Sequence, residues 1–212
     1  MTNAQPLTEK GRETRERIVR AAQELVADRG VAATSLDNVR ARARASKSQL
    51  YHYFTDRDDL LRAVARAASD DVLGGQSELF ERLDTLDGLR AWINALVTLQ
   101  ETRNAKGGCP IGSLAGQLAE RDEGARLELV DGMDRWEAGI RHGLEKMAAR
   151  GELRPDADPA ALAQRTLAAV QGGLLLTQIR RDPTQLRSAL DGALAAILAA
   201  RNAPKKRRTP KP

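Results

Sequence analysis

Apolar residues recur at intervals of three and four along most of the chain, which is the spacing of one face of an α-helix. Residues 13–28 show this pattern through Ile18, Ala22 and Leu25, and Arg29-Gly30 supplies a C-terminal stop. β-Branched and aromatic residues do not cluster in alternation with polar ones, so no strand is predicted. The sequence therefore predicts an all-α fold with about nine helices.

Helix ends are marked by N-cap residues, glycines and prolines. After 13–28, these signals predict helices at 36–43, 47–54, 57 to Gly74-Gly75, 86–102, a short one ending near 119, 124–149, 159–180 and 184–200. We expect a DNA-binding domain at 1–56, a ligand-binding and dimerisation domain at 57–200, and a disordered basic tail at 201–212. The assignment of the first two domains depends on the motif described next.

Residues 34–54, TSLDNVRARARASKSQLYHYF, contain two short predicted helices joined by a tight turn. Ser46, followed three residues later by Gln49, is a capping-box signature at the start of the second helix. In a helix-turn-helix the second helix enters the DNA major groove and the first crosses the backbone. We predict that Ser46, Ser48 and Gln49 lie near base edges, and that Thr34, Lys47, Tyr51, His52 and Tyr53 reach phosphates.

Three aromatic residues within four positions also suit a small hydrophobic core. Phe54, four residues after Leu50, is assigned to that core. Tyr51 and Tyr53 cannot both point inward, because residues two apart lie about 200° apart around a helix. At least one of the two tyrosines is therefore expected on the surface.

Residues 13–64 resemble the TetR family of bacterial transcriptional regulators. The resemblance is carried by Arg29-Gly30, Thr34-Ser35, Val39, Ala43, the run SKSQLYHYF at 46–54, Arg57 and Leu60-Leu61. It implies a homodimer that binds a palindromic double-stranded DNA operator, and it places Arg57 at a DNA-contacting position together with the residues proposed above. The segment 108–112 and the run 171–176 resemble the branch of this family that includes LmrA-like and YxaF-like regulators.

The turn departs from the family pattern, which usually has Gly then Val where this chain has Arg44-Ala45. A residue other than glycine in a left-handed turn costs about 1 kcal/mol. Arg40, where the family usually has a small residue, adds charge beside the DNA backbone with Arg42 and Arg44. We therefore expect a strained or slightly reshaped turn, and Arg44 among the DNA contacts.

The second half of the chain predicts a dimer interface and an apolar pocket. The segment 160–180 is apolar nearly all round, so it needs burial on more than one side. Packed with the last helix against a two-fold copy, it would form a four-helix interface through Leu167, Val170, Leu174, Leu175, Leu190, Leu194 and Ile197. Candidate pocket residues, each of which also suits a plain core, are Trp92, Leu96, Leu99, Cys109, Met133, Trp136, Ile140 and Gln171.

The formal charge of +5 is unevenly distributed. Residues 1–54 contain ten basic and six acidic residues, residues 55–200 contain 18 and 23, and residues 201–212 contain six and none. A basic front supports nucleic-acid binding. The acidic excess of residues 55–200 indicates either solvated helix faces or a preference for cationic ligands. The basic residues of 201–212 either attract phosphates or solubilise the end of the chain.

Several classes of protein are excluded. No apolar run is long enough to span a bilayer and no signal-peptide core is present, which predicts a cytoplasmic protein without membrane contact. Cys109 is alone, so neither a disulfide nor a Cys-cluster metal site is predicted, and its other interpretation is a redox sensor. No catalytic constellation is visible. We predict a non-enzymatic repressor without cofactor or metal, released from DNA by a small-molecule effector; the alternative is a DNA-binding regulator that acts without a ligand.

Overall fold

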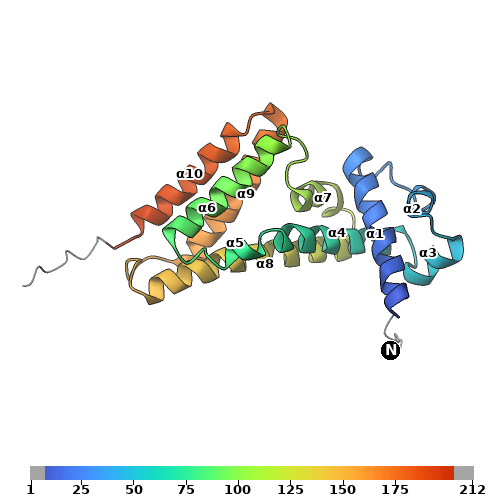
Figure 1. Cartoon of the computed structure of the whole chain (residues 1–212), viewed down its shortest axis with the longest axis horizontal. Helices are drawn as coiled ribbons and strands as arrows, with labels where there is room; N and C mark the ends of the chain where they lie inside the picture. The colour runs from blue at the N-terminus through green and yellow to red at the C-terminus, as the bar shows by residue number, and fades with distance from the viewer. Residues whose placement is uncertain (1–7, 203–212) are drawn as a thin grey trace, which may run out of the picture. The chain divides into compact units, whose positions relative to one another are not determined.

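The computed structural model describes residues 8–202, and α-helices make up nearly all of this part of the chain (Figure 1). A single antiparallel bridge, between Leu153 and Arg201, is found outside the helices of the described residues. The helices are α1 (Glu9–Arg29), α2 (Leu36–Ala43), α3 (Lys47–Tyr53), α4 (Arg57–Gly74), α5 (Ser77–Phe80), α6 (Leu86–Thr102), α7 (Pro110–Leu118), α8 (Glu123–Ala149), α9 (Pro159–Arg180) and α10 (Thr184–Ala199).

The all-α prediction is confirmed, and most predicted helix bounds agree with the structure to within one or two residues. Two differences have local causes. The first helix begins at Glu9 and not at the predicted residue 13, because the Thr8 hydroxyl accepts from Gly11 N–H and caps an additional first turn. This turn has no apolar residues at helical spacing, so the apolar pattern did not predict it. The four-residue α5 was not predicted, because so short a helix carries no periodic signal.

The chain divides into two compact units. Unit 1 contains residues 8–75 and 109–134, and unit 2 contains residues 76–108 and 135–202, as far as the chain is described. The long helix α8 contributes its first part to unit 1 and its second part to unit 2. Helix α4, which follows the predicted domain limit at residue 56, packs against α1 within unit 1.

Buried apolar residues of the first four helices form the core of unit 1, in which α2 and α4 pack against α1. Ile18 of α1, Val39 of α2 and Leu50 of α3 are each at most 1 % exposed, and Val64 brings α4 onto the same core. Phe54, which ends α3, is likewise buried, in agreement with its predicted place in the core. This burial stabilises the two short helices α2 and α3, which would be marginal as isolated helices.

An ion pair joins α4 to the start of α8 in unit 1. Arg62 donates from Nε and Nη2 to the two carboxylate oxygens of Asp122, each over 3.1 Å. The bond from Arg62 and the one from Ala125 N–H both lower the pKa of Asp122. Because this pKa is lowered on folding, Asp122 stabilises unit 1 at neutral pH and loses that effect as the pH falls through the lowered value.

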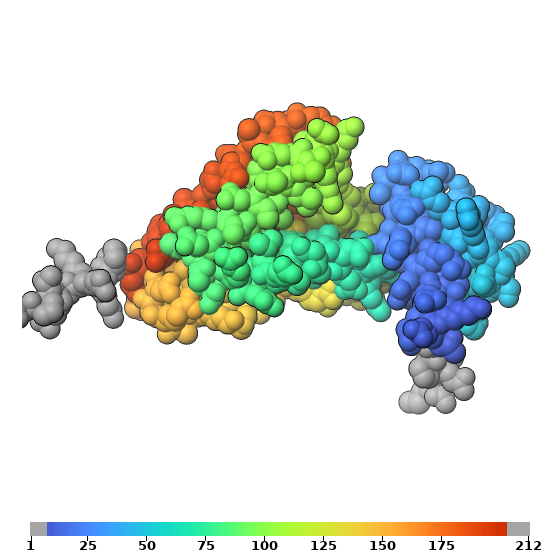
Figure 2. All heavy atoms as spheres, in the orientation of Figure 1, coloured from blue at the N-terminus to red at the C-terminus, as the bar shows by residue number. Residues whose placement is uncertain are grey.

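Close backbone approach fixes the packing of unit 2. A side-chain carbon placed on Gly173 of α9 would lie 2.8 Å from Leu186 Cδ1 of α10, and one on Gly143 of α8 would lie 2.7 Å from the Leu83 carbonyl. Trp92 Nε1 donates to Gln76 Oε1 over 2.8 Å in the interior. Figure 2 shows α6 and α10 adjacent on one face of this unit.

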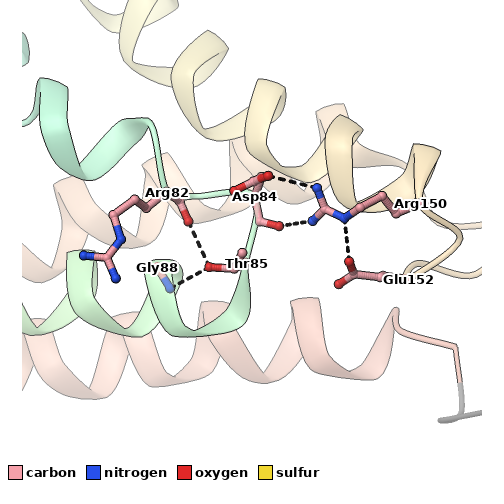
Figure 3. Close-up of polar contacts among 6 residues, drawn as sticks. All are labelled: Arg82, Asp84, Thr85, Gly88, Arg150 and Glu152. Carbon is pink, nitrogen blue, oxygen red and sulfur yellow. Dashed lines mark hydrogen bonds and ion pairs between the residues drawn. The ribbon is translucent and has the colours of Figure 1, made fainter.

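The segment between α5 and α6 is tied to the end of α8 by Arg150. Arg150 Nη1 lies 2.9 Å from Asp84 Oδ2, and its Nε lies 2.7 Å from Glu152 Oε1 (Figure 3). Thr85 caps α6 by accepting from Gly88 N–H over 3.0 Å, while its hydroxyl donates to Arg82 O. This arrangement orients the first turn of α6.

The folded part of unit 2 extends to Asn202. The Asn202 side chain donates to the carbonyls of Gly151 and Leu153, each over 2.8 Å. Arg201 and Asn202 therefore belong to the fold and not to the predicted disordered tail, of which residues 203–212 lie outside the described residues. Within the described part, no helix combines the length and hydrophobicity needed to cross a membrane.

The turn between α2 and α3 is left-handed at Arg44, with φ 50° and ψ 42°. Arg44 N–H donates to Ala41 O over 3.2 Å, and Ala45 N–H donates to Arg40 O over 3.0 Å. The predicted strained turn is therefore confirmed, with an arginine in a backbone region that favours glycine.

Replacing Arg44 by glycine should stabilise the protein by about 1 kcal/mol, because the left-handed conformation then carries no Cβ penalty. Equilibrium unfolding in urea measures this change. Arg44→Ala is the matched control, since it removes the guanidinium and keeps the Cβ. Equal stabilisation by both variants would show that charge, and not φ, determines the stability at this position.

Candidate nucleic-acid interface

Four polar side chains form one exposed face of α3. Lys47, Ser48, Tyr51 and His52 are all exposed, and their spacing of one and four residues places them on the same side of the helix. Tyr51 is 50 % exposed, whereas Leu50, on the opposite side, is 1 % exposed. The exposure predicted for one of the two tyrosines is therefore observed at Tyr51, and Tyr53 is half-buried.

A capping box fixes the N-terminal end of this face. Ser46 N–H donates to Gln49 Oε1 over 2.9 Å, and Gln49 N–H donates to Ser46 Oγ over 3.1 Å. The Gln49 amide oxygen is thus used within the helix, which leaves its Nε2 as the group that can face a base. Ser46 orients the helix through the same pair of bonds.

The aromatic rings of α3 restrain its charged and titratable side chains. Lys47 Nζ lies 6.0 Å from the centroid of the Tyr51 ring, within the range of a cation–π interaction. The His52 and Tyr53 rings meet edge to face, with centroids 4.8 Å apart. These pairs order the side chains of an exposed helix face, which reduces the entropy lost when that face binds a partner.

Thr34 and Arg57, both predicted to contact DNA, lie within the framework of the α1–α2 loop. Thr34 is 4 % exposed and its hydroxyl donates to Gly30 O over 2.9 Å. Arg57 Nε donates to Thr34 O over 2.9 Å, and Arg57 Nη2 donates to Val31 O. The N-cap of α2 is Ser35, whose hydroxyl accepts from Asn38 N–H over 3.2 Å. In this structure Thr34 and Arg57 therefore shape the loop instead of extending from it.

A glutamine of α7 completes the loop framework. Val31 N–H donates to Gln117 Oε1 over 2.8 Å, and Gln117 Nε2 donates to Ser113 O within α7. Gly30 has φ 80°, and a Cβ at this position would lie 3.1 Å from the same glutamine oxygen. No sequence signal marked Gln117, because it lies 86 residues from its partner.

Two of the three arginines around the turn are paired with carboxylates. Arg42 Nε lies 2.8 Å from Glu24 Oε2, and Arg40 Nε lies 3.5 Å from Asp37 Oδ1. Arg44 and Lys47 are exposed and form no ion pair with a described carboxylate. The positive charge available to a phosphate is therefore concentrated at the turn and the start of α3.

The candidate pocket residues are divided between the two units. Cys109 and Met133 belong to unit 1, and the other six belong to unit 2. Leu99 is 41 % exposed, so it does not line the interior of the protomer, and Trp92 uses its N–H for Gln76. Sequence reasoning missed Gln100, which is 2 % exposed and lies on the buried face of α6.

Most of the predicted dimer-interface residues are buried inside the protomer. Leu167, Val170, Leu174, Leu190 and Ile197 are at most 8 % exposed, because α9 and α10 pack against each other within one chain. Leu175 is 57 % exposed and Leu194 is half-buried. The other large apolar side chains exposed on these helices are Leu176, Ile179 and Leu198.

Comparisons with known proteins agree with this geometry. Residues 18–64 match the family model described as bacterial regulatory proteins, tetR family, and residues 85–193 match that of the tetracyclin repressor-like C-terminal domain. The transcriptional regulator AcuR of Cereibacter sphaeroides is 25 % identical over 173 residues, which are 81 % of this chain and 79 % of that protein. A TetR transcriptional regulator structure from Chloroflexus aurantiacus superposes with a TM-score of 0.75 at 27 % identity, covering 92 % of this chain and 100 % of the other.

The predicted branch of the family remains a prediction. YxaF of Bacillus subtilis, an HTH-type transcriptional regulator, is 24 % identical over 182 residues, 85 % of this chain and 92 % of that protein. This distance does not establish membership of its branch. The two family models together span the helix-turn-helix and most of the remaining helices. The chain belongs to the TetR family and is a DNA-binding transcriptional regulator, not an enzyme.

Proposed function

We propose that the protein is a cytoplasmic repressor that binds a palindromic operator as a homodimer and leaves it when a small molecule binds the C-terminal part of the chain. The observation that carries the DNA-binding half of this proposal is the exposed α3 face of Lys47, Ser48, Tyr51 and His52. The proposal of a repressor is supported by the family description of residues 85–193.

The α3 face has the chemistry needed for the major groove. Ser48 and Gln49 Nε2, at the first turn of α3, are placed to meet base edges. Lys47, Tyr51 and His52 supply an ammonium, a hydroxyl and an imidazole for phosphates, and Arg44 supplies a second cation at the turn. Thr34 and Arg57 act indirectly in this proposal, by holding the loop that precedes α2.

Lys47→Ala should weaken operator binding about tenfold, because one phosphate contact is lost. The slope of log K against log salt concentration should become less steep by about one, because about one counterion fewer is released. Fluorescence anisotropy with labelled operator at several salt concentrations measures both effects. Lys146→Ala, an exposed lysine of unit 2, is the control and should leave both unchanged. Equal losses in the two variants would contradict the assignment of DNA binding to α3.

The proposed dimer surface is the exposed apolar face of α9 and α10. On α9 it consists of Ala168, Gly172, Leu175, Leu176 and Ile179. On α10 it continues through Gly192, Ala195, Leu198 and Ala199. No atom lies within 4 Å of a Cβ placed on Gly172 or Gly192, so a second copy could approach closely at both positions. A two-fold dimer would present two α3 helices to half-sites about 34–36 Å apart.

The double variant Leu175→Glu, Ile179→Glu should be a monomer. Each substitution replaces an exposed apolar side chain by a charge that an apolar interface cannot solvate. Size-exclusion chromatography with light scattering measures the mass. Leu127→Glu is the control, since Leu127 is 53 % exposed on α8 in unit 1. A double variant that keeps the dimer mass would refute this surface.

The Gln117–Val31 hydrogen bond connects α7 with the DNA-binding helices within unit 1. The chain leads from α6 of unit 2 through residues 103–109 directly into α7. A ligand that favours one conformation of unit 2 would shift α7, and thereby the α1–α2 loop, if it binds the two conformations with different affinity.

Gln117→Leu should destabilise the protein by about 1–3 kcal/mol and weaken operator binding, because the Val31 N–H loses its acceptor. Gln117→Glu keeps an acceptor oxygen and should retain more stability and affinity. Urea unfolding and operator titration of both variants, with dimer mass as a check, measure the effect. Identical behaviour of the leucine variant and the unmodified protein would exclude this role for Gln117.

A gel shift with the DNA upstream of the protein's own gene, repeated with a panel of small molecules, tests the proposed function as a whole. We expect a retarded complex that at least one compound dissociates. A complex that no compound affects would favour the alternative of a regulator acting without a ligand. The absence of any complex would contradict the proposed operator.

A further inference from the structure

Four buried side-chain polar atoms of unit 2 have no hydrogen-bond partner among the described residues. One is Arg201 Nε, which lies beyond α10; the other three lie on helices and are Gln100 Oε1 on α6, Trp136 Nε1 on α8 and Gln171 Nε2 on α9. Gln100 and Trp136 are 2 % and 1 % exposed. Burial of an unpaired polar group costs free energy, so native proteins keep such groups where a ligand or an ordered water satisfies them.

The three helical groups lie on α6, α8 and α9, which all contribute to unit 2. Arg181, which ends α9, donates to Ala105 O just beyond α6, so these two helices meet at their C-terminal ends. A Cβ on Gly108 would lie 2.4 Å from Gln178 Oε1, and Gln171 lies on the same face of α9 as Gln178, two turns earlier.

Near Trp136, α8 approaches Phe80, whose ring lies beside that of Trp92 on α6. Trp136 lies one turn before Gly139, where a Cβ would be 3.0 Å from the Phe80 ring, and this ring lies 6.5 Å from that of Trp92. Gln100 shares with Trp92 and Leu96 the buried face of α6. Residues of α6, α8 and α9 therefore direct unpaired polar atoms into the interior of one unit.

No charged residue of the described chain is fully buried, and the buried Arg201 Nε belongs to a half-buried residue beyond α10. The buried polar residues of the described chain are threonines, a serine and glutamines, and no Asp, Glu, Lys, Arg or His is among them. A charged ligand moved into such surroundings would lose its hydration without gaining a counter-charge. A neutral ligand meets no such penalty, and the apolar side chains around the three groups favour it.

We infer that the effector is an uncharged molecule whose hydrogen-bond acceptor is held by Trp136 Nε1, with the amides of Gln100 and Gln171 as its further partners. This inference rests on the proposed function, since it names the class of ligand that would release the operator. The tryptophan can only donate, whereas each glutamine amide can turn to donate or accept. The ligand must therefore carry a hydrogen-bond acceptor. In this inference the acidic excess of residues 55–200 does not give the site a preference for a cationic ligand.

Three probes of similar size and different charge test the inference. Benzamide is neutral and has a carbonyl acceptor, benzoate is an anion, and benzylamine is a cation at neutral pH. Each is added to the full chain at the same millimolar concentration, and the thermal unfolding midpoint and tryptophan fluorescence are recorded. We expect benzamide to raise the midpoint and change the fluorescence, and the two charged probes to do neither.

Two tryptophans make a matched pair of variants, since the chain contains no others. Trp136→Phe removes the unpaired N–H and should abolish the benzamide shift. Trp92→Phe removes an N–H that is already bonded to Gln76 and should keep the benzamide shift. It should lower the unfolding midpoint of the free protein more than Trp136→Phe does. Gln171→Leu, which retains both tryptophans, should reduce the shift.

The outcomes separate this inference from the proposed function. An equal or larger shift with benzoate or benzylamine, no shift with any probe, or a benzamide shift that survives Trp136→Phe would overturn the inference. Operator binding without probes is measured in parallel by gel shift. Loss of operator binding there would contradict the proposed function, whatever the probes show.

Discussion

The α1–α2 loop is held from two sides, and the orientation of the DNA-binding helices depends on this constraint. Val31 donates its N–H to Gln117 of α7, and its carbonyl accepts from Arg57 of α4, which also donates to Thr34 O. The end of α1 leaves backbone groups without intrahelical partners, and a cation near that end complements the helix dipole. One arginine and one glutamine therefore satisfy the loop backbone and attach α1 and α2 to α4 and α7.

Two residues predicted to contact DNA form hydrogen bonds within the same loop. Thr34 is buried, and Arg57 directs two of its nitrogen donors at backbone carbonyls. Thr34 was predicted to reach a phosphate, and the family resemblance placed Arg57 at a DNA-contacting position. The exposed face of α3 is formed by Lys47, Ser48, Tyr51 and His52.

Most helices and helix ends and the α3 capping box were predictable from the sequence because their signals are local, whereas α5 and the start of α1 were not. Ser46 and Gln49 are three residues apart, and the bounds of α2 and α6 follow from nearby caps and apolar spacing. The Gln117–Val31 bond was not predictable, since only the tertiary fold brings those residues together. The apolar pattern of α9 and α10 also could not distinguish packing within one chain from packing between two copies, and Leu190 and Ile197, predicted at the dimer interface, are buried within the protomer.

The chain keeps local features that cost stability where function is proposed: a left-handed Arg44 beside the DNA-binding helix and unpaired polar atoms within unit 2. DNase footprinting on the DNA upstream of its gene tests the central claim, that a two-fold dimer presents two α3 helices to an operator. It should reveal two symmetry-related protected half-sites whose centres are about one helical turn, or a multiple of it, apart. Protection of a single unsymmetrical site, or none, would contradict it.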